Sequence, residues 1–295
     1  MAYAPVEPAS NMVDRAGKTK SGQGLTNRNM IAEVGWVPTI FCAMTILVEN
    51  HDRVTVITLN DPDRRNTVTA PMNEALIEAV AAAEADDGIG ALILTGAGRA
   101  FCAGAHLDDL LGAQNADELS AIYEGFLAVA HSSLPTIAAV NGAAVGAGMN
   151  LALAADMILA GESARFDSRF HQIAIHSGGG HTWRLRNKTD EQTAKAMVIF
   201  GEQLTGPQAA EAGLAWKCVP DAELLDAAIA YGVTAAAAPK ALVAKTKETF
   251  SLLDTIGTSP ESVVLETTPQ FWAMQQPEFK EFVANLKARI AAKKG

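Results

Sequence analysis

The sequence contains few cysteines and few aromatic residues. Its three cysteines, Cys42, Cys102 and Cys218, are widely spaced in 295 residues, with no CxxC pair and no Cys/His grouping. An odd number of such cysteines does not suit a disulfide framework, and the spacing gives no zinc site. Aromatic residues make up 6% of the chain. The composition therefore predicts reduced thiols, no bound metal, and small residues that let helices pack closely.

Basic clusters and long apolar runs are also scarce. The formal net charge is -10, and no run of Lys and Arg is long enough to form the basic face that a nucleic-acid binder needs. The longest apolar run near the start, Val37–Val48, contains Pro38 and is shorter than the roughly 20 residues of a membrane-spanning helix. We therefore expect no nucleic-acid partner, no membrane association and a cytoplasmic location.

Three parts of the chain differ in pattern. Residues 1–43 mix Pro, Ser, Gly, Asn and Lys without a sustained period, so we interpret them as an irregular N-terminal extension. A clear strand pattern starts directly after Met44, and we therefore expect the native protein to begin there. Residues 44–200 alternate strands with helices, which indicates an α/β fold with parallel crossovers. Residues 201–295 are almost entirely helical in pattern.

Periodicity predicts the individual elements. Strands are expected at Ile46–Glu49, Val54–Leu59, Ala91–Thr95, Pro135–Val140, Met157–Ala160 and Ala215–Val219. Helices are expected at Pro71–Ala85, Ala116–Ala130, Gly148–Ala155, Glu191–Phe200, Pro207–Ala212, Ala222–Ala236 and Lys240–Leu253, with two more in the last 35 residues.

Two glycine-rich segments each follow a predicted apolar strand. They are Ala100–Leu107 (AFCAGAHL) and Asn141–Asn150 (NGAAVGAGMN), and the second leads directly into a helix. Small residues let a ligand approach the backbone, and a helix start leaves N–H groups free at the positive end of its dipole. Two such N–H groups on one oxygen would stabilise an enolate or a tetrahedral oxyanion. Either segment alone is as typical of a tight turn, and the second lacks the Lys-Ser/Thr of a phosphate-binding loop.

Four segments, in order and with natural spacing over about residues 45–250, resemble the crotonase family of enoyl-CoA hydratases and isomerases. The matching segments are Asp61–Asn66 (family pattern N-R-P-x-x-x-N-A), Phe101–Leu107 (F-x-A-G-x-D-L), Pro135–Gly142 with Gly146–Gly148 (P-x-I-A-A-x-N-G…G-G-G) and Leu204–Leu214 (L-T-G-x-x-A-x-x-x-G-L).

This resemblance implies a fold and a ligand. The fold is an α/β spiral of ββα units with a helical C-terminal region, residues 201–295, that assembles the chain into a trimer or a dimer of trimers. The ligand is an acyl-CoA or enoyl-CoA thioester of fatty acid metabolism. No cofactor beyond its coenzyme A moiety and no metal is implied.

The resemblance also assigns site residues. The oxyanion donors are the backbone N–H groups of Ala105 and Ala147. The residues implied in coenzyme A binding are Arg64, Arg65, Ala103 and Gly104. A solvated turn explains the two arginines equally well.

The acid positions of the family hold other residues in this chain. Adding water across an enoyl thioester needs a general base for the water and an acid for Cα. Typical hydratases of the family use two glutamates, and the matching positions are Asn150 and Phe170. The aspartate that some relatives carry matches Gly178. The resemblance therefore supports acyl-CoA binding more firmly than hydration by two carboxylates.

Histidines stand near these positions. His176 lies in the glycine-rich loop, and His106 directly follows the first implied donor. A histidine with a pKa near 6.5 can act as a base at neutral pH. We therefore predict catalytic or positioning roles for His176 and His106, and for Asn150, which can hold a water but cannot take a proton.

Two further polar residues are expected to have structural roles. His181 opens the next predicted helix and is expected to cap it or to pack. Asp167 is expected to pair with Arg165 or Arg169.

Three functions remain open. The first is a hydratase or isomerase with substituted catalytic groups. The second is another reaction that relies on the oxyanion hole, such as thioester hydrolysis or enolate protonation. The third is a non-catalytic acyl-CoA binder or carrier. Turnover of 2-enoyl-CoA thioesters discriminates among them, whereas binding does not.

Overall fold

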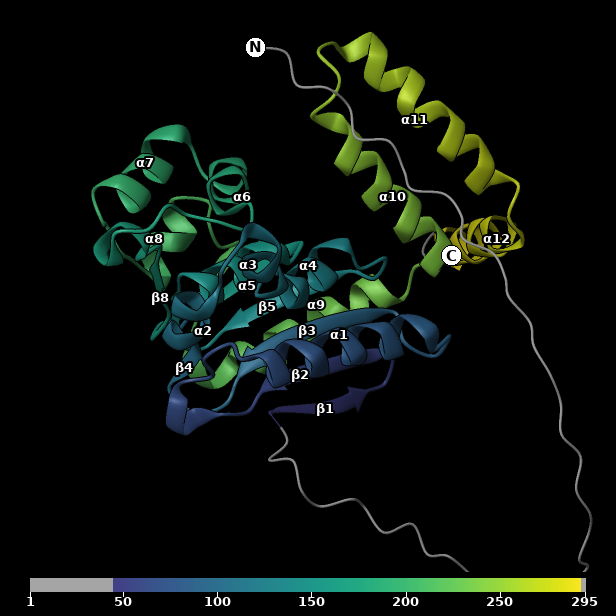
Figure 1. Ribbon diagram of the computed structural model, residues 1–295. Coiled ribbons are helices and arrows are strands. Elements are labelled where there is room, and N and C mark those ends of the chain that lie inside the picture. The colour runs from purple at the N-terminus through teal and green to yellow at the C-terminus, as the bar shows by residue number, and fades with distance from the viewer. Residues whose placement is uncertain (1–44, 293–295) are drawn as a thin grey trace, which may run out of the picture. The chain divides into compact units, whose positions relative to one another are not determined.

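The computed structural model describes residues 45–292 (Figure 1). The predicted N-terminal extension, residues 1–43, lies outside the described residues. The helices are α1 (Ala70–Ala85), α2 (Leu107–Gly112), α3 (Ala116–Ala121), α4 (Glu124–His131), α5 (Ala147–Ala154), α6 (His181–Lys188), α7 (Glu191–Ile199), α8 (Gly206–Glu211), α9 (Leu224–Ala236), α10 (Lys240–Leu253), α11 (Ser259–Met274) and α12 (Pro277–Ala292). Three short 3-10 helices are η1 (Pro62–Arg64), η2 (Phe170–Ile173) and η3 (Asp221–Glu223).

A six-stranded sheet has the order β1-β2-β3-β5-β7-β10. Its strands are β1 (Ile46–His51), β2 (Val54–Leu59), β3 (Ala91–Gly96), β5 (Thr136–Val140), β7 (Met157–Gly161) and β10 (Lys217–Val219). The first two strands form an antiparallel hairpin, and every other neighbouring pair is parallel. Parallel neighbours need crossover connections, which here are largely helical. The sheet therefore confirms the predicted α/β class.

Alternate residues of the large sheet face two apolar cores. Leu92 and Leu94 of β3 belong to the main core, together with Met72 of α1. Ile93, between them, belongs to a second core with Ala228 of α9. A sheet that is covered on both faces needs apolar residues at successive positions. This explains why the strands are short apolar runs with little alternation.

A second, four-stranded sheet has the order β4-β6-β8-β9. Its strands are β4 (Ala100–Cys102), β6 (Ala143–Val145), β8 (Arg165–Asp167) and β9 (Leu204–Thr205). The first three follow directly after β3, β5 and β7, so the chain repeats a two-strand unit. Segments of two or three residues show no period, and periodicity predicted none of them. The predicted division at residue 200 falls before the last strand of each sheet.

The helix predicted over residues 116–130 is wrong in one respect, because the structure breaks it into α3 and α4. Tyr123 stands at the break. The Asn73 side-chain amide donates to the carbonyl oxygens of Ala121 at 3.0 Å and Ile122 at 3.1 Å. Asn73 thus takes two carbonyls that an unbroken helix would use for its own N–H groups.

The C-terminal helices begin with α10, whose predicted bounds are confirmed at both ends. Figure 1 shows α10 and α11 side by side. Lys240 Nζ donates to the carbonyl oxygen of Glu84 at 3.0 Å, and Lys247 Nζ lies 2.7 Å from a carboxylate oxygen of Asp156. These lysines join α10 to the α/β part. Within residues 45–292, no single helix is long and apolar enough to cross a membrane, although one pair bent by 102°, Asp221–Ala236 with Lys240–Leu253, passes on length and composition.

Asn66 fixes the loop that precedes α1. It is fully buried and has a φ of 56°. Its Nδ2 donates to the carbonyl oxygens of Ala97 (2.9 Å), Ala100 (2.8 Å) and Phe101 (3.2 Å), and its Oδ1 accepts the Asp61 N–H at 2.9 Å. One amide thus satisfies backbone groups within β4, just before it and at Asp61.

We predict that Asn66→Ala lowers the free energy of unfolding by about 3 kcal/mol or more, because it adds unpaired buried carbonyls to the strain of a left-handed alanine. Asp52, which is exposed and has a φ of 51°, provides the matched control. Asp52→Ala should cost only about 1–2 kcal/mol. Urea titrations measure both changes, and equal losses would contradict the proposed anchoring role.

Candidate active site

The two glycine-rich turns meet because the strands before them pair. β4 and β6 are parallel neighbours, with Ala100 opposite Ala143, so their carboxyl ends lie at the same edge. Gly104 has a φ of 109°, and a Cβ built there would lie 3.0 Å from the carbonyl oxygen of Val145 and 3.9 Å from the nitrogen of Ala147. The turns therefore touch, and the backbone of Gly104 favours a residue without a side chain.

The N–H of Ala105 points away from the chain that flanks the first turn. Val68 N donates to the Gly104 carbonyl at 2.8 Å, and His106 N donates to the Val68 carbonyl at 3.0 Å. In such a parallel bridge, the groups of Ala105 itself face the other edge. Residues 65–68 occupy one edge, so the N–H of Ala105 faces the edge where β6 lies.

The N–H of Ala147 is free because it begins a helix. Ala147 is the first residue of α5, after Gly146 with a φ of 51°, and an N–H in the first turn has no intrahelical acceptor. It lies at the positive end of the helix dipole. A Cβ on Gly148 would lie 2.1 Å from the carbonyl oxygen of Cys102, so only glycine lets α5 approach β4 this closely. The structure thus places both implied donors on touching turns.

A chain of uncharged hydrogen bonds lies behind the second turn. Asn150, in α5, is buried and donates from Nδ2 to the Gly178 carbonyl at 3.1 Å. Its Oδ1 lies 2.9 Å from His181 Nδ1, and His181 Nε2 lies 2.9 Å from Ser168 Oγ. A carbonyl needs a donor, so the Asn150 NH2 faces Gly178 and its oxygen faces His181. His181 therefore carries its proton on Nδ1 and accepts the Ser168 hydroxyl at Nε2.

His181 is held in its neutral form. Its side chain is buried at the start of α6, with the Phe170 ring edge-on at 4.9 Å. Burial, and secondarily the positive charge of Arg184, lower its pKa from 6.5 to about 4. Of the two roles predicted for His181, packing is confirmed and capping is not, because its side chain makes no capping bond. It packs instead against Phe170 and bonds Asn150.

The other predicted histidines lie in more open places. His176 is exposed, and its Nδ1 lies 2.6 Å from the carbonyl oxygen of Ser177. The side chain of His106 is 41% exposed, with Nδ1 3.8 Å from an Asp108 carboxylate oxygen. The structure therefore brings His181 to Asn150, whereas the sequence pointed to His176 because it lies in the glycine-rich loop near the acid positions. Nothing local revealed this, because Asn150 and His181 are separated by 31 positions.

The two arginines implied in coenzyme A binding lie beside the first glycine-rich turn. Arg64 is 70% exposed in its side chain and lies 3.9 Å from Asp61. Arg65 has a φ of 54°, and its carbonyl accepts the N–H of Ala103 at 3.0 Å. Residues 64–65 therefore support the first turn through the backbone and leave the Arg64 guanidinium in solvent.

Asp167 pairs with Arg169, which is one of its two predicted partners. Arg169 Nε donates to its Oδ2 at 2.8 Å, and Gln203 Nε2 donates to the same oxygen at 3.0 Å. No group of three His, Cys, Asp or Glu side chains within residues 45–292 is arranged to hold a metal ion.

A cavity of about 340 Å³ lies beside the first turn. Its size falls within the range of small-molecule sites. It extends from Val68, the bridge partner of Ala105, to Ile122 at the break between α3 and α4. Its full lining is Val68, Thr69, Ala70, Asn73, Asp108, Asp109, Gly112, Ala113, Glu118, Ala121 and Ile122.

The family model described as "Enoyl-CoA hydratase/isomerase" matches residues 49–282. The chain belongs to the enoyl-CoA hydratase/isomerase family. It is 42% identical to a probable enoyl-CoA hydratase, echA14, of Mycobacterium tuberculosis over 84% of this chain and 96% of that protein. It is 33% identical to the 1,2-epoxyphenylacetyl-CoA isomerase of Escherichia coli over 83% of this chain and 95% of that protein.

The solved enoyl-CoA hydratase of Bacillus anthracis superposes with a TM-score of 0.78 at 28% identity, covering 83% of this chain and 96% of that chain. The match confirms the crotonase-like fold of this enoyl-CoA hydratase/isomerase family member.

We predict that His181 makes stability depend on pH. The pKa of His181 is about 4 in the folded chain and 6.5 in the unfolded chain. Between these two pH values the unfolded chain binds a proton that the folded chain does not. The contribution of His181 to the free energy of unfolding is complete above pH 6.5 and is lost as the pH is lowered towards 4. The free energy of unfolding should be about 2 kcal/mol lower at pH 5 than at pH 7.5. Urea titrations at both values should show that His181→Gln removes this difference, while the exposed control His51→Gln keeps it.

Proposed function

We propose that this chain binds acyl-CoA thioesters with the thioester oxygen between the N–H groups of Ala105 and Ala147, and that it converts 2-enoyl-CoA substrates of fatty acid metabolism. The observation that carries the proposal is the contact between two turns that each present a free N–H. Each such donor typically contributes about 2.7–4 kcal/mol to stabilising the charge that develops on the oxygen.

The groups proposed around the acyl chain are largely uncharged. By family resemblance, Asn150, Phe170 and Gly178 occupy the positions at which relatives carry acids. Asn150 is fixed by two hydrogen bonds, and its neighbour His181 is neutral at physiological pH. We therefore propose that the backbone pair supplies most of the transition-state stabilisation and that Asn150 orients a water or an acyl hydroxyl.

The remaining assignments are also proposals. His106 adjoins the first donor, and His176 lies in the loop that Asn150 holds, so each is a candidate for positioning the ligand. Arg64, Arg65, Ala103 and Gly104 are proposed to bind the coenzyme end. The exposed Arg64 guanidinium supports this, because a chain with a net charge of -10 needs a local cation to attract a polyanion.

We predict turnover of crotonyl-CoA and longer 2-enoyl-CoA thioesters, measured as loss of the conjugated absorbance. Ala147→Pro removes one donor at a helix position that tolerates proline, and it should lower kcat about 100-fold. Glu191→Pro, at the first position of α7, is the matched control and should leave kcat unchanged. Asn150→Ala and His176→Ala should each lower kcat if these residues take part.

Three outcomes separate the alternatives. Micromolar binding of crotonyl-CoA without turnover would favour a carrier and would refute the enzymatic proposal. Release of free coenzyme A thiol in place of hydrated product would favour thioester hydrolysis. An unchanged kcat in Ala147→Pro would remove the oxyanion role of that N–H.

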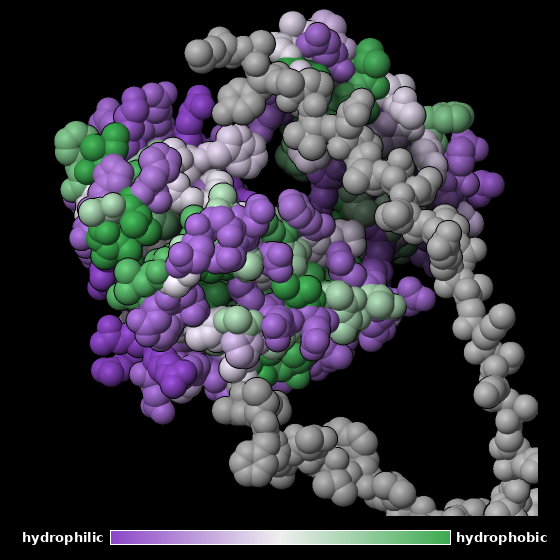
Figure 2. Space-filling model, in the orientation of Figure 1, coloured by the Kyte–Doolittle hydropathy of each residue, from purple (hydrophilic) through white to green (hydrophobic). Residues whose placement is uncertain are grey.

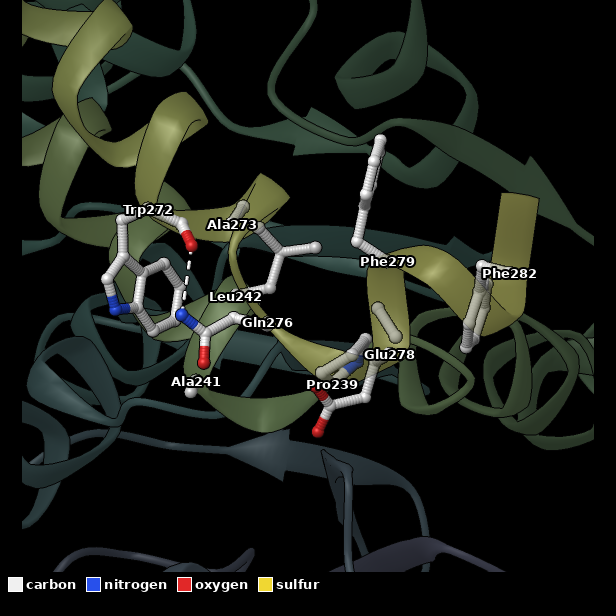
Figure 3. A pocket seen from close by; sticks show the side chains of 10 residues that line it. Pro239, Ala241, Leu242, Trp272, Ala273, Gln276, Glu278, Phe279 and Phe282 are labelled. Carbon is white, nitrogen blue, oxygen red and sulfur yellow. Dashed lines mark hydrogen bonds between the residues drawn. The ribbon is translucent and has the colours of Figure 1, made fainter. Parts of the chain in front are cut away.

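We also propose that the C-terminal helices assemble the chain into a trimer. Figure 2 shows apolar residues among polar ones on the face that it presents. On α12, Phe279 and Phe282 are 41% and 50% exposed. With Trp272 and Leu242 they line an apolar pocket of about 330 Å³ (Figure 3). Apolar patches of this kind mark sites of association.

Changing Phe279 and Phe282 together to Glu should therefore shift the sedimentation mass from trimer towards monomer, because two charges would have to be desolvated. Phe200→Glu, at a side chain 82% exposed after α7, is the control and should leave the mass unchanged. A monomeric wild-type chain would refute the proposal.

A further inference from the structure

The glycines of the loop before α6 leave space for one tyrosine. A Cβ built on Gly178 would lie 2.2 Å from the hydroxyl oxygen of Tyr123 and 3.0 Å from its Cζ. A Cβ on Gly179 would lie 3.1 Å from Cδ1 of the same ring. The phenol hydroxyl therefore stands where a side chain at position 178 would stand.

Tyr123 is held at this place by the helix break. Its own N–H donates to the Ser120 carbonyl at 2.8 Å, and Asn73 holds the two carbonyls just before it. Its ring lies 5.5 Å from that of Phe126. The side chain is half-buried between the break and the glycine loop, so its hydroxyl has a defined position.

The hydroxyl is available to a ligand. Among residues 45–292, no side chain or backbone group forms a hydrogen bond with it. Burial raises the pKa of Tyr123 above its usual value of 10, so the group is protonated at neutral pH. A buried polar group is normally paired, and one that faces a ligand site is free to donate.

The hydroxyl and the proposed thioester site share one loop. The Gly178 carbonyl accepts the Asn150 Nδ2–H at 3.1 Å, and Asn150 lies one turn after Ala147 in α5. Ile122, adjacent to Tyr123, lines the cavity that begins at Val68, the bridge partner of Ala105. The cavity thus runs from the helix break to Val68, which flanks the first donor turn.

We propose that Tyr123 is the proton donor of this site. The inference rests on the proposed function, because it needs an enolate held on the N–H groups of Ala105 and Ala147. When the enolate collapses, its electron pair forms a C–H bond at Cα with the phenol proton, and the C–O bond returns to a carbonyl. The water that adds at Cβ loses one proton to solvent, and the phenolate takes one proton back from solvent, so the donor is restored and the protons balance.

Three polar groups near the glycine loop are less suited to this role. Asn150 is an amide with no proton to give. The Nδ1 proton of His181 is bonded to Asn150, and the Asp167 carboxylate is held by Arg169 through Oδ2, while its Oδ1 is buried without a hydrogen-bond partner among the described residues. Tyrosine hydroxyls are established acids in enzyme sites.

The test compares Tyr123→Phe with wild type on crotonyl-CoA. The variant keeps the ring that packs on Gly178, Gly179 and Phe126 and loses only the hydroxyl. We expect kcat to fall about 100-fold or more with KM within about threefold, as for loss of a general acid. Tyr231→Phe makes the same chemical change at a hydroxyl that accepts a bond from Trp216, and kcat should be unchanged there.

Labelling separates proton transfer from a structural role. In D2O the wild type should place deuterium on one face of Cα, because a fixed donor reaches one face. Tyr123→Phe should label both faces, since solvent then delivers the deuteron. An equal kcat with the same one-sided labelling in both proteins would overturn the proton donor and leave the proposed function standing. A wild type that binds crotonyl-CoA without converting it would overturn both.

A second variant reaches the hydroxyl from the other side. Gly178→Ala introduces a Cβ 2.2 Å from the hydroxyl oxygen and must displace it, so its kcat should fall as in Tyr123→Phe. Gly257→Ala, where an added Cβ meets nothing within 4 Å, is the control and should keep full activity. If Tyr123→Phe does not fold, full activity in Gly178→Ala would still overturn the proposal.

Discussion

The parallel pairing of β4 with β6 is the constraint on which the site depends. Both strands end at one edge, so the turns that follow them touch without any side chain to join them. Gly104 and Gly148 are the points of closest approach, and the latter would place a Cβ 2.1 Å from the Cys102 carbonyl. The N–H of Ala105 and that of Ala147 are consequently positioned by backbone geometry, which changes little with pH or with side-chain rotamers.

Two buried asparagines support these turns from opposite sides. Asn66 bonds the carbonyls of the segment around β4, and Asn150 bonds the loop that carries Gly178. An amide can donate and accept at once, so it satisfies buried backbone groups without the desolvation penalty of a charge. His181 acts in the same way as the asparagines. Its lowered pKa keeps the ring neutral, so that one ring nitrogen donates a hydrogen bond and the other accepts one. The site is thereby rigid and low in charge.

The sequence allowed prediction of the parts whose signal is local. A strand, a glycine-rich turn and a helix in succession identified the segments of Ala105 and Ala147, and α10 has the predicted bounds. The strands β4, β6 and β8 have three residues each, too few to show a period. His181 meets partners 13 and 31 positions away, which only the folded chain reveals. Tyr123 was hidden inside a predicted helix, because the break depends on the distant side chain of Asn73.

The proposed donor constrains the chemistry of the site. A phenol with a raised pKa gives up a proton to a strongly basic enolate, but its phenolate is too scarce at neutral pH to abstract one from Cα. The proposed donor therefore suits protonation of an enolate better than removal of a Cα proton. Reactions in which a nucleophile adds to Cβ and the enolate is then protonated fit better, since the backbone pair stabilises the oxyanion and Tyr123 ends the step. Addition to 2-enoyl-CoA, with the nucleophile oriented by Asn150, is the reaction that the proposed donor and the backbone pair serve best.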